Sequence, residues 1–275
     1  MSEGQDILYE VRGKVTIITL NLPDKLNALN GAQYNLLGKL VERADKEEDT
    51  IITLLQATGR YFSAGANVAD KNLSSVDPST LFSHEYWLAN FVARNVWLTD
   101  LFHNHRKILA AAVNGPVIGL STALLALCDL IYVKDTTKFF LLAPFANLGL
   151  VAEGASSSTL FLRLGWSKSA EALLLARPIK GEELERIGFI NKSYNGQFST
   201  TEEFNQHVHD ELVSQVENLH EDSIYQNKEL LKAQRDQLIT SSNSREVTRG
   251  LYKWLDGIPQ SRFVQMSQKE RKHKF

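Results

Sequence analysis

The sequence predicts an α/β fold that is followed by a helical C-terminal region. From residue 7 to about residue 195, short apolar or β-branched runs alternate with segments of helical periodicity. Strands that alternate with helices in this way are typical of α/β proteins. After residue 196 the strand-like runs end, and charged, helix-forming segments follow. We therefore expect a core over residues 1–196 and a helical region over residues 197–275.

The chain opens with a predicted hairpin and a capped helix. Residues 7–20 contain two alternating runs around a glycine turn, a pattern typical of a β-hairpin. Apolar residues recur at helical spacing over residues 30–48, and Asn30 stands where an N-cap is favoured. A β-branched run over residues 50–57 predicts the next strand. Residues 59–67 follow it as a loop of small side chains.

The middle of the chain alternates between loops, helices and buried strands. Residues 69–84 are rich in polar residues, and we expect a flexible loop over the neighbouring site. Residues 84–105 predict an amphipathic helix that is rich in aromatic side chains. Strands are expected at residues 108–113 and 130–133, on either side of a helix at residues 121–128 that is apolar nearly all round.

The remaining segments continue this pattern and then become helical. Residues 138–142 predict a short strand, and residues 154–164 predict a helix that opens just after Glu153. Two further helical patterns cover residues 167–176 and 180–187. The C-terminal helices are expected over residues 202–219, 221–238 and 244–256, with a tail after them.

Composition and charge exclude several classes of protein. The formal net charge of -2 gives no field that would attract nucleic acid. The single cysteine, Cys128, excludes an internal disulfide, and its apolar surroundings favour an inert, packed thiol. No apolar run reaches the ~20 residues of a membrane span, and no secretory signal opens the chain. Since His84, His103 and His105 show no metal-ligand spacing with acidic partners, we expect no metal site.

Two glycine loops predict a site for a developing negative charge. Gly65 precedes Ala66 after one strand, and Gly119 precedes Leu120 where another strand turns into the apolar helix. N–H groups in such loops have no backbone partner and favour an anion or a carbonyl oxygen that gains charge. The N–H groups of Ala66 and Leu120 together would form an oxyanion hole. An ordinary glycine turn of a βαβ unit explains either loop when it is taken alone.

Four motifs in order along the chain resemble the crotonase (enoyl-CoA hydratase/isomerase) superfamily. They lie at residues 23–29 (PDKLNAL), 62–67 (FSAGAN), 114–120 (NGPVIGL) and 128–132 (CDLIY). Within the superfamily, the fungal peroxisomal Δ3-Δ2-enoyl-CoA isomerases are the most similar group. That similarity lies in residues 90–95, residues 144–150 and Glu153-Gly154.

The resemblance implies a β-spiral core with a helical C-terminal region that makes oligomer contacts, in a homotrimer or homohexamer. It implies an acyl-CoA thioester as substrate and no separate cofactor, because coenzyme A is part of the substrate. The aromatic residues of the helix at 84–105 would pack on the core, and an alternative is that they line a slot for the acyl chain. The expected substrate contacts are Lys25, Ala28, Ala64, Gly65, Ala66, Asn67, Val68 and Leu120.

Glu153 is the candidate catalytic base. Its small and apolar neighbours would desolvate the carboxyl and raise its pKa toward a useful range. The alternative is a helix-start glutamate that only interacts with the helix dipole. The resemblance favours the base, because the catalytic glutamate of the isomerase group falls at this position of the motif. Asn95 is expected either to satisfy its hydrogen bonds within the core or to orient Glu153.

Departures from the superfamily pattern indicate the reaction. Hydratases of the superfamily carry glutamates at the positions of Ala123 and Phe145. Adding water to a double bond needs both carboxylates, whereas moving a double bond needs one base that carries a proton from C2 to C4. Asn67 replaces the usual aspartate, and we expect little loss because the oxyanion hole uses the N–H of Ala66.

These features together predict an isomerase of fatty acid β-oxidation that converts 3-enoyl-CoA into trans-2-enoyl-CoA. Two alternatives stay open: a catalytically silent scaffold that binds acyl-CoA, and another crotonase-type enzyme such as a dienoyl-CoA isomerase. The resemblance favours the peroxisome over the cytoplasm. The C-terminal His273-Lys274-Phe275 shares only its lysine with the S-K-L address that the peroxisomal import receptor reads.

Overall fold

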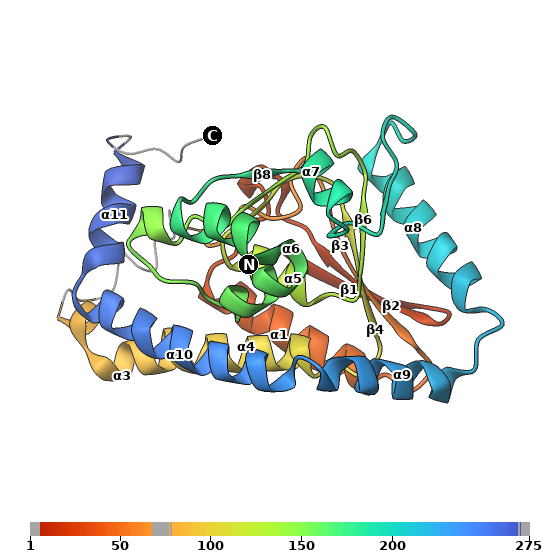
Figure 1. Cartoon of the computed structure of the whole chain (residues 1–275), viewed down its shortest axis with the longest axis horizontal. Helices are drawn as coiled ribbons and strands as arrows, with labels where there is room; N and C mark the ends of the chain where they lie inside the picture. Colours follow the sequence, from red (N-terminus) through yellow and green to blue (C-terminus); the bar gives the residue numbers. More distant parts are fainter. Residues whose placement is uncertain (1–5, 68–76, 78, 269, 271–275) are drawn as a thin grey trace.

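Two β-sheets form the centre of the molecule (Figure 1). This computed structural model describes residues 6–67, 77, 79–268 and 270. The larger sheet has the strand order β1-β2-β3-β4-β6-β9, and the smaller sheet has the order β5-β7-β8. The larger sheet consists of β1 (Ile7–Arg12), β2 (Val15–Leu20), β3 (Ile52–Ala57), β4 (Ile108–Val113), β6 (Leu130–Val133) and β9 (Lys192–Ser193). The smaller sheet consists of β5 (Val117–Ile118), β7 (Phe140–Leu142) and β8 (Ile179–Lys180).

The larger sheet is parallel apart from the predicted hairpin. β1 and β2 pair in antiparallel fashion, which confirms the hairpin at residues 7–20. The pairs that follow, from β2 to β9, are all parallel. Every residue of β2 is buried, as is usual for an interior strand of a sheet that is covered on both faces. The strands β5, β8 and β9 were not predicted, because two residues are too few for a periodic pattern.

The N-terminal helices begin close to their predicted positions. The side chain of Asn30 accepts a hydrogen bond from the N–H of Gln33, and the side chain of Gln33 accepts one from the N–H of Asn30. This capping box explains why α1 (Gly31–Lys46) starts where it does. The helix predicted at residues 84–105 forms in three consecutive segments. They are α3 (His84–Trp87), the π-helical η3 (Leu88–Ala93) and α4 (Arg94–His103).

The other helices follow the predicted order with three differences. The break that was expected between residues 238 and 244 lies instead between Ala233 and Asp236, because α10 already begins at Asp236. α6 joins two predicted helical patterns and is interrupted at Gly165, where φ is 74° and ψ is 170°. The expected C-terminal tail is instead helical over Ile258–Ser267. The short helices are η1 (Pro23–Lys25), η2 (Thr80–Phe82) and η4 (Ala146–Leu148). The longer ones are α5 (Leu120–Leu127), α6 (Ser156–Leu174), α7 (Gly181–Arg186), α8 (Thr201–Val216), α9 (Glu221–Ala233), α10 (Asp236–Leu255) and α11 (Ile258–Ser267).

Hydrophobic clusters cover both faces of the larger sheet. Successive residues of β4 alternate between them, as the two-residue period of a strand requires: Leu109 belongs to the first cluster and Ala110 to the second. The first cluster packs the sheet against α1, α4, α5 and α6. The second cluster packs it against α8 through Phe204 and Leu212. The division at residue 196 stays a prediction, although α8 shares this core.

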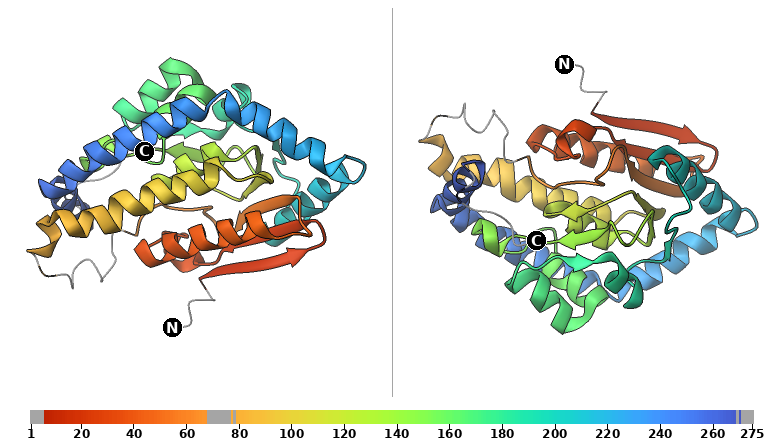
Figure 2. Two further views of the ribbon diagram at one scale, coloured as in Figure 1. Left: turned by 90° about the horizontal axis from the view of Figure 1, so that it is seen from below. Right: turned by 90° about the horizontal axis from the view of Figure 1, so that it is seen from above.

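Three helices that are far apart in the sequence lie side by side. Figure 2 shows α4 between α1 and α10, and both neighbours contact it. Since α4 carries Asn95 and α10 belongs to the C-terminal region, this packing brings the C-terminal region next to a predicted site residue.

Two predicted features lie wholly or partly outside the described residues. Of the loop expected over residues 69–84, residues 69–76 and 78 lie outside the described residues, as does the tripeptide at 273–275. Among the residues that the structure describes, no helix combines the length and the apolar character needed to cross a membrane.

Candidate active site

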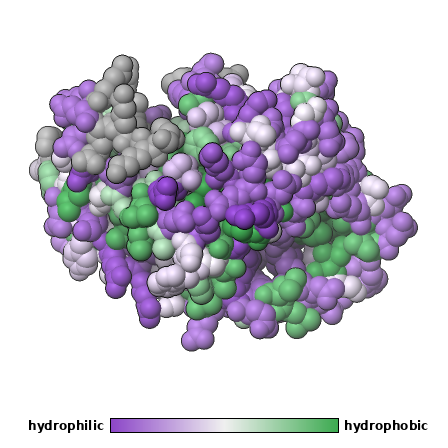
Figure 3. All heavy atoms as spheres, turned by 45° about the horizontal axis from the view of Figure 1, so that its top comes forward, coloured by the Kyte–Doolittle hydropathy of each residue, from purple (hydrophilic) through white to green (hydrophobic). Residues whose placement is uncertain are grey.

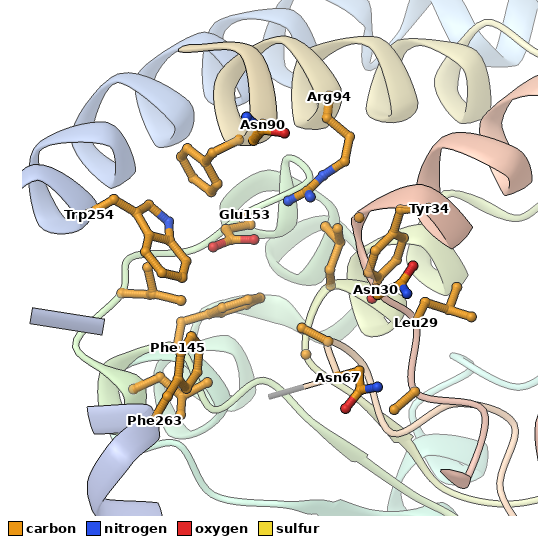
Figure 4. A pocket seen from close by; sticks show the side chains of 18 of the residues that line it. Leu29, Asn30, Tyr34, Asn67, Asn90, Arg94, Phe145, Glu153, Trp254 and Phe263 are labelled. Carbon is orange, nitrogen blue, oxygen red and sulfur yellow. The ribbon is translucent and has the colours of Figure 1, made fainter. Parts of the chain in front are cut away.

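A cavity of about 600 Å³ lies where α1, η3, α4, α5, α10 and α11 converge (Figure 4). Its lining is mostly apolar with a few polar groups, as is usual for sites that bind small organic molecules. Glu153 is the only acidic side chain and Arg94 the only arginine or lysine in the described lining. The polar and aromatic residues of this lining include Asn30, Tyr34, Asn35, Asn67, Tyr86, Trp87, Asn90, Trp254 and Phe263.

Two loops contribute Ala66 and Leu120 to this lining, as the glycine motifs predict. The loops touch at their glycines. Gly65 has a φ of +82°, and a Cβ atom there would lie 2.5 Å from the carbonyl oxygen of Ile118. Gly119 has a φ of +66° and directly precedes α5. Any side chain at these two positions would strain the backbone, and at Gly65 it would also force the loops apart.

The N–H groups of Ala66 and Leu120 have no backbone acceptor among the described residues. Ala66 pairs with Leu29 in a short parallel bridge, but the hydrogen bonds of that bridge are made by Gly65 and Asn67. Leu120 is the first residue of α5, so its N–H has no partner within the helix. Two free donors at the edge of one cavity are the arrangement that an oxyanion hole requires.

Two buried serine hydroxyls join these loops from behind. Ser63 Oγ lies 2.8 Å from the Oγ of Ser121, the residue that directly follows Leu120 in the chain. Ser63 Oγ also donates to the carbonyl oxygen of Asn27 at 2.9 Å and accepts from the N–H of Gly65 at 3.1 Å. The bridge therefore sets the spacing between the loops that carry the two free donors.

Glu153 faces the cavity from the turn that precedes α6 (Figure 4). It is 7% exposed, and burial raises the pKa of its carboxyl to about 7, against opposing effects of Arg94 and Asn95. Asn95, which is fully buried on α4, donates from Nδ2 to Glu153 Oε2 at 3.1 Å. A carboxyl with a pKa near neutral pH is suited both to take up and to return a proton.

Arg94 is a cavity residue that the sequence analysis did not identify. Figure 4 shows its guanidinium group reaching between Glu153 and Tyr34. Its Nε donates to Asn95 Oδ1 at 3.3 Å, and its Cζ lies 5.7 Å from the centre of the Tyr34 ring. Burial lowers the pKa of Arg94 while the charge of Glu153 raises it, and arginine remains charged in such a site. Arginines on amphipathic helices are usually solvated, so the residue type gave no reason to place Arg94 in a site. The sequence offered only its position next to Asn95.

Apolar side chains occupy the two positions where hydratases carry glutamates. Ala123 is fully buried within α5, and its Cβ packs close to Gly154. Phe145 is 3% exposed and lines the cavity. Glu153 therefore has no second carboxylate beside it in the described lining.

The structure places the predicted substrate contacts in three groups. Five of the eight line the cavity: Ala28, Ala64, Ala66, Asn67 and Leu120. Lys25 and Gly65 do not belong to the described lining, and Lys25 is exposed on η1. Val68 lies outside the described residues. The role of each as a contact stays a prediction.

The part of the cavity next to the C-terminal helices is aromatic. Trp87 and Phe91 come from the predicted aromatic helix. Both pack in a buried hydrophobic cluster, as expected, and both also line the cavity; that they form a slot for an acyl chain stays a prediction. Trp254 on α10 stacks on Trp87 with ring centres 4.2 Å apart, and Phe263 on α11 packs against Trp254. The C-terminal contributions were missed because nothing in residues 197–275 alone indicates which surface these helices cover.

The chain matches the family described as enoyl-CoA hydratase/isomerase over residues 10–257. It belongs to the enoyl-CoA hydratase/isomerase family. This membership confirms the superfamily assignment and the crotonase-like α/β fold. Among solved structures, an enoyl-CoA hydratase/isomerase from Pseudoalteromonas atlantica has the same fold, with a TM-score of 0.80, 23% identity, and coverage of 98% of this chain and 99% of that one.

Two fungal members of the enoyl-CoA hydratase/isomerase family are similar over nearly their whole length. The 3,2-trans-enoyl-CoA isomerase of Saccharomyces cerevisiae is 42% identical over 275 residues, which is 99% of this chain and 98% of the relative. The Delta(3,5)-Delta(2,4)-dienoyl-CoA isomerase of Pyricularia oryzae is 39% identical over 274 residues, which is 96% of this chain and 97% of the relative.

Proposed function

We propose that this protein is a Δ3-Δ2-enoyl-CoA isomerase that converts 3-enoyl-CoA into trans-2-enoyl-CoA. One observation carries the proposal: the one acidic side chain of the described lining, a buried carboxyl with a pKa of about 7, shares the cavity with two backbone N–H groups that have no backbone acceptor among the described residues. The 42% identical yeast relative, which is named as a 3,2-trans-enoyl-CoA isomerase, supports it.

The reaction follows from these groups in two proton transfers. The N–H groups of Ala66 and Leu120 bind the thioester carbonyl oxygen, and the carboxylate of Glu153 removes a proton from C2. The electron pair of the broken C–H bond forms a C1=C2 double bond, and the carbonyl pair moves onto the oxygen, which gives a dienolate. The oxygen therefore carries negative charge between the two steps. Glu153 then returns its proton to C4: the C3=C4 pair forms the new C4–H bond, the C1=C2 pair moves to C2=C3, and the carbonyl double bond is restored, so that no atom is gained or lost.

The site favours isomerisation over hydration. Activating and positioning a water molecule needs a second carboxylate, and Ala123 and Phe145 stand where hydratases carry theirs. The described lining holds no further acidic side chain. We also propose that the reaction uses no cofactor beyond the coenzyme A of the substrate, because acid–base transfer through Glu153 and charge stabilisation by the loops complete it.

A dienoyl-CoA isomerase is the second candidate. The Pyricularia relative with that name is nearly as similar as the yeast one. Moving a 3,5-diene to the 2,4 position carries a proton from C2 to C6, and a base must lie within hydrogen-bond reach of both carbons. The carboxylate of Glu153 stands on a short turn and is hydrogen-bonded by Asn95, so it reaches C2 and C4 more readily than C2 and C6. We therefore rank the 3-enoyl substrate first.

The deciding experiment incubates pure protein with 3-hexenoyl-CoA and follows the absorbance of the conjugated 2-enoyl product. The wild type should turn over, and Glu153→Gln should lower turnover by ~100-fold or more while acyl-CoA binding persists. Glu229→Gln, at an exposed position on α9, is the matched control and should leave turnover unchanged.

Three other results would assign the protein differently. Binding of acyl-CoA with no turnover of any enoyl substrate would identify the catalytically silent scaffold. Faster turnover of a 3,5-dienoyl-CoA than of 3-hexenoyl-CoA would identify the dienoyl-CoA isomerase. A Glu153→Ala variant with near-wild-type turnover would remove Glu153 from the mechanism.

We further propose a homotrimer or homohexamer. Figure 3 shows hydrophobic patches among the hydrophilic residues on one face of a single chain. Several large apolar side chains are well exposed, including Trp166 (76%) on α6 and Leu231 (75%) on α9. Surfaces of this kind mark protein–protein contacts. Light scattering coupled to size-exclusion chromatography would test the mass.

We propose the peroxisome as the location and β-oxidation as the pathway. The similarity of residues 144–154 to the fungal peroxisomal isomerases supports this. A mouse relative that is 28% identical over 200 residues carries the name enoyl-CoA delta isomerase 3, peroxisomal. Fluorescence of a fusion protein with and without residues 273–275 would show whether the import receptor uses this C-terminus.

A further inference from the structure

A buried glutamate of the C-terminal region contacts the turn that carries Glu153. Glu246 lies on α10 and is 5% exposed, and it does not belong to the described lining of the cavity. Its Oε2 accepts a hydrogen bond from the N–H of Ala155 at 2.7 Å, and its Oε1 accepts one from the N–H of Ser157 at 2.8 Å. Both carboxylate oxygens of Glu246 are therefore used at the start of α6.

Glu246 supplies a cap that α6 does not have locally. The N-cap residue of α6 is Ala155, whose methyl side chain offers no acceptor to the N–H groups of the first turn. Those N–H groups need an acceptor, and a carboxylate at this end of a helix is favoured by the dipole and by charge-assisted hydrogen bonding. The acceptor arrives from a segment 91 residues further along the chain.

The backbone between Glu153 and α6 needs this support. Gly154 and Ala155 have φ values of 69° and 60°. A left-handed conformation is unfavourable for alanine and persists only where surrounding contacts enforce it. The hydrogen bond from Ala155 to Glu246 fixes the peptide unit next to Gly154. The direction in which Glu153 points therefore depends on a contact with α10.

The same helix, α10, also contacts α4 beside Asn95, the hydrogen-bond partner of Glu153. Asn243 lies one turn before Glu246 on α10 and is 7% exposed. Its Nδ2 donates to the carbonyl oxygen of Val96 at 3.3 Å, and Val96 directly follows Asn95 on α4. Through these two side chains, α10 contacts both sides of the hydrogen bond between Asn95 and Glu153.

Three ionisable side chains face the carboxyl of Glu153 from three helices. Arg94 on α4 favours its charged form and Glu246 on α10 disfavours it, whereas Tyr34 on α1 is neutral because burial raises the pKa of its phenol to about 12. Repulsion from Glu246 adds to burial in raising the pKa of Glu153. Of the three, Glu246 is the one that also hydrogen-bonds to the turn next to Glu153.

We propose that Glu246 is a positioning residue for the isomerisation: it holds the turn at residues 153–155 so that the carboxylate of Glu153 faces the substrate beside Asn95. The catalytic part of this inference rests on the proposed function. A cap without a catalytic role would change only the stability of α6. A positioning residue also changes kcat and the pH at which Glu153 titrates.

The test compares two Glu246 variants with a control on the same helix interface. Glu246→Gln keeps the shape but has one acceptor oxygen, and its NH₂ group opposes one of the two N–H donors. Glu246→Asp keeps the charge but is one methylene too short for both contacts. Ser242→Ala removes a neighbouring hydrogen bond between α10 and Ser158 of α6 without touching the turn. kcat and KM for 3-hexenoyl-CoA are measured from pH 5 to 9, and infrared difference spectra follow the carboxyl band that Glu153→Gln abolishes.

We expect Glu246→Gln to lower kcat by about 10- to 100-fold with a much smaller change in KM, because misplaced catalytic groups cost turnover rather than binding. The acidic limb of its kcat profile and its infrared midpoint should both move to lower pH, since the repulsion is gone. Glu246→Asp should lower kcat with a smaller shift of the midpoint. Ser242→Ala should match the wild type in all readouts.

Each of the other outcomes decides a separate question. A folded Glu246→Gln with wild-type kcat and midpoint overturns the proposal, and so does loss of folding in both Glu246 variants, which would make Glu246 a residue of the fold. If Glu246→Gln alone fails to fold, a fully active Glu246→Asp overturns the proposal. If the wild type does not isomerise 3-hexenoyl-CoA, the proposed function fails. The infrared midpoints alone then decide whether Glu246 controls Glu153.

Discussion

The burial that raises the pKa of Glu153 should also destabilise the fold, and Glu153→Gln measures by how much. The carboxyl is 7% exposed, and its pKa rises from an ordinary value of 4.5 to about 7 in the folded chain. A shift of this size corresponds to about 3 kcal/mol of free energy of unfolding at a pH where the folded carboxyl is ionised. Glutamine resembles the neutral carboxyl and still accepts the hydrogen bond from Asn95 Nδ2. The variant should therefore be more stable than the wild type by up to about 3 kcal/mol at pH 8.

The Glu153→Gln variant should not be less stable than the wild type at any pH, but the size of the stability difference depends on pH. Below about pH 4.5, Glu153 is protonated in both the folded and the unfolded chain, so that glutamine offers no advantage. Between about pH 4.5 and 7 the unfolded carboxyl ionises while the folded one stays protonated, and the wild type loses stability relative to the variant. Above about pH 7 both are ionised, and the difference is constant.

Urea unfolding at fixed protein concentration, followed by far-ultraviolet circular dichroism from pH 4.5 to 8, measures this difference. Glu229→Gln, at an exposed position of α9, is the control and should stay within about 0.5 kcal/mol of the wild type throughout. A Glu153→Gln variant that is equally stable at every pH would refute the reasoning, because it would show that folding does not shift the carboxyl. A variant that is less stable at pH 8 would show that Arg94 and Asn95 outweigh burial.

Three further predictions concern the reaction. In the wild type, kcat/KM should fall about tenfold per pH unit below about pH 7, as Glu153 becomes protonated. Arg94→Gln should move this acidic limb of the pH profile to higher pH by about one unit, since it removes the cation that favours the carboxylate. An acidic limb that moves to lower pH would contradict this. Leu120→Pro deletes one oxyanion donor at the first position of α5 and should cost ~3 kcal/mol in the transition state, whereas Leu120→Ala keeps the donor; equal turnover in two folded variants would remove Leu120 from the mechanism. Hydration of 2-enoyl-CoA should be negligible, and 3-hydroxyacyl-CoA formed at a rate comparable to isomerisation would overturn the argument from Ala123 and Phe145.

The parts of the fold that sequence predicted correctly depend on interactions between near neighbours. The capping box of Asn30 and Gln33 closes within four residues, and it places the start of α1. The hairpin at residues 7–20 needs only a glycine turn between two strands. The glycines at 65 and 119 have positive φ values that their sequence motifs imply. In each case the residues that decide the conformation stand next to one another in the chain.

The parts that the sequence did not predict depend on contacts between distant segments. The two-residue strands β5, β8 and β9 exist because partner strands lie beside them, and no periodic pattern fits in two residues. Arg94 looks like a surface arginine until Glu153 and Tyr34 are placed around it. Trp254 reaches the cavity only because α10 packs along α4. The helical region after residue 197 was predicted as helical, but its part in the site could not be.

The contacts between α10 and the turn at residues 153–155 have a physical reason if Glu153 is the base. A carboxyl in an apolar cavity is a useful base only if it is held in place, because a buried glutamate that is free to rotate would turn toward water or toward Arg94. The turn at 153–155 is too short and its backbone too unfavourable to provide this hold alone. Asn95 restrains one carboxylate oxygen from α4, and Glu246 restrains the backbone from α10. The proposed base thus has its contacts in distant segments: Asn95 lies 58 residues before Glu153, and Glu246 lies 91 residues after Ala155.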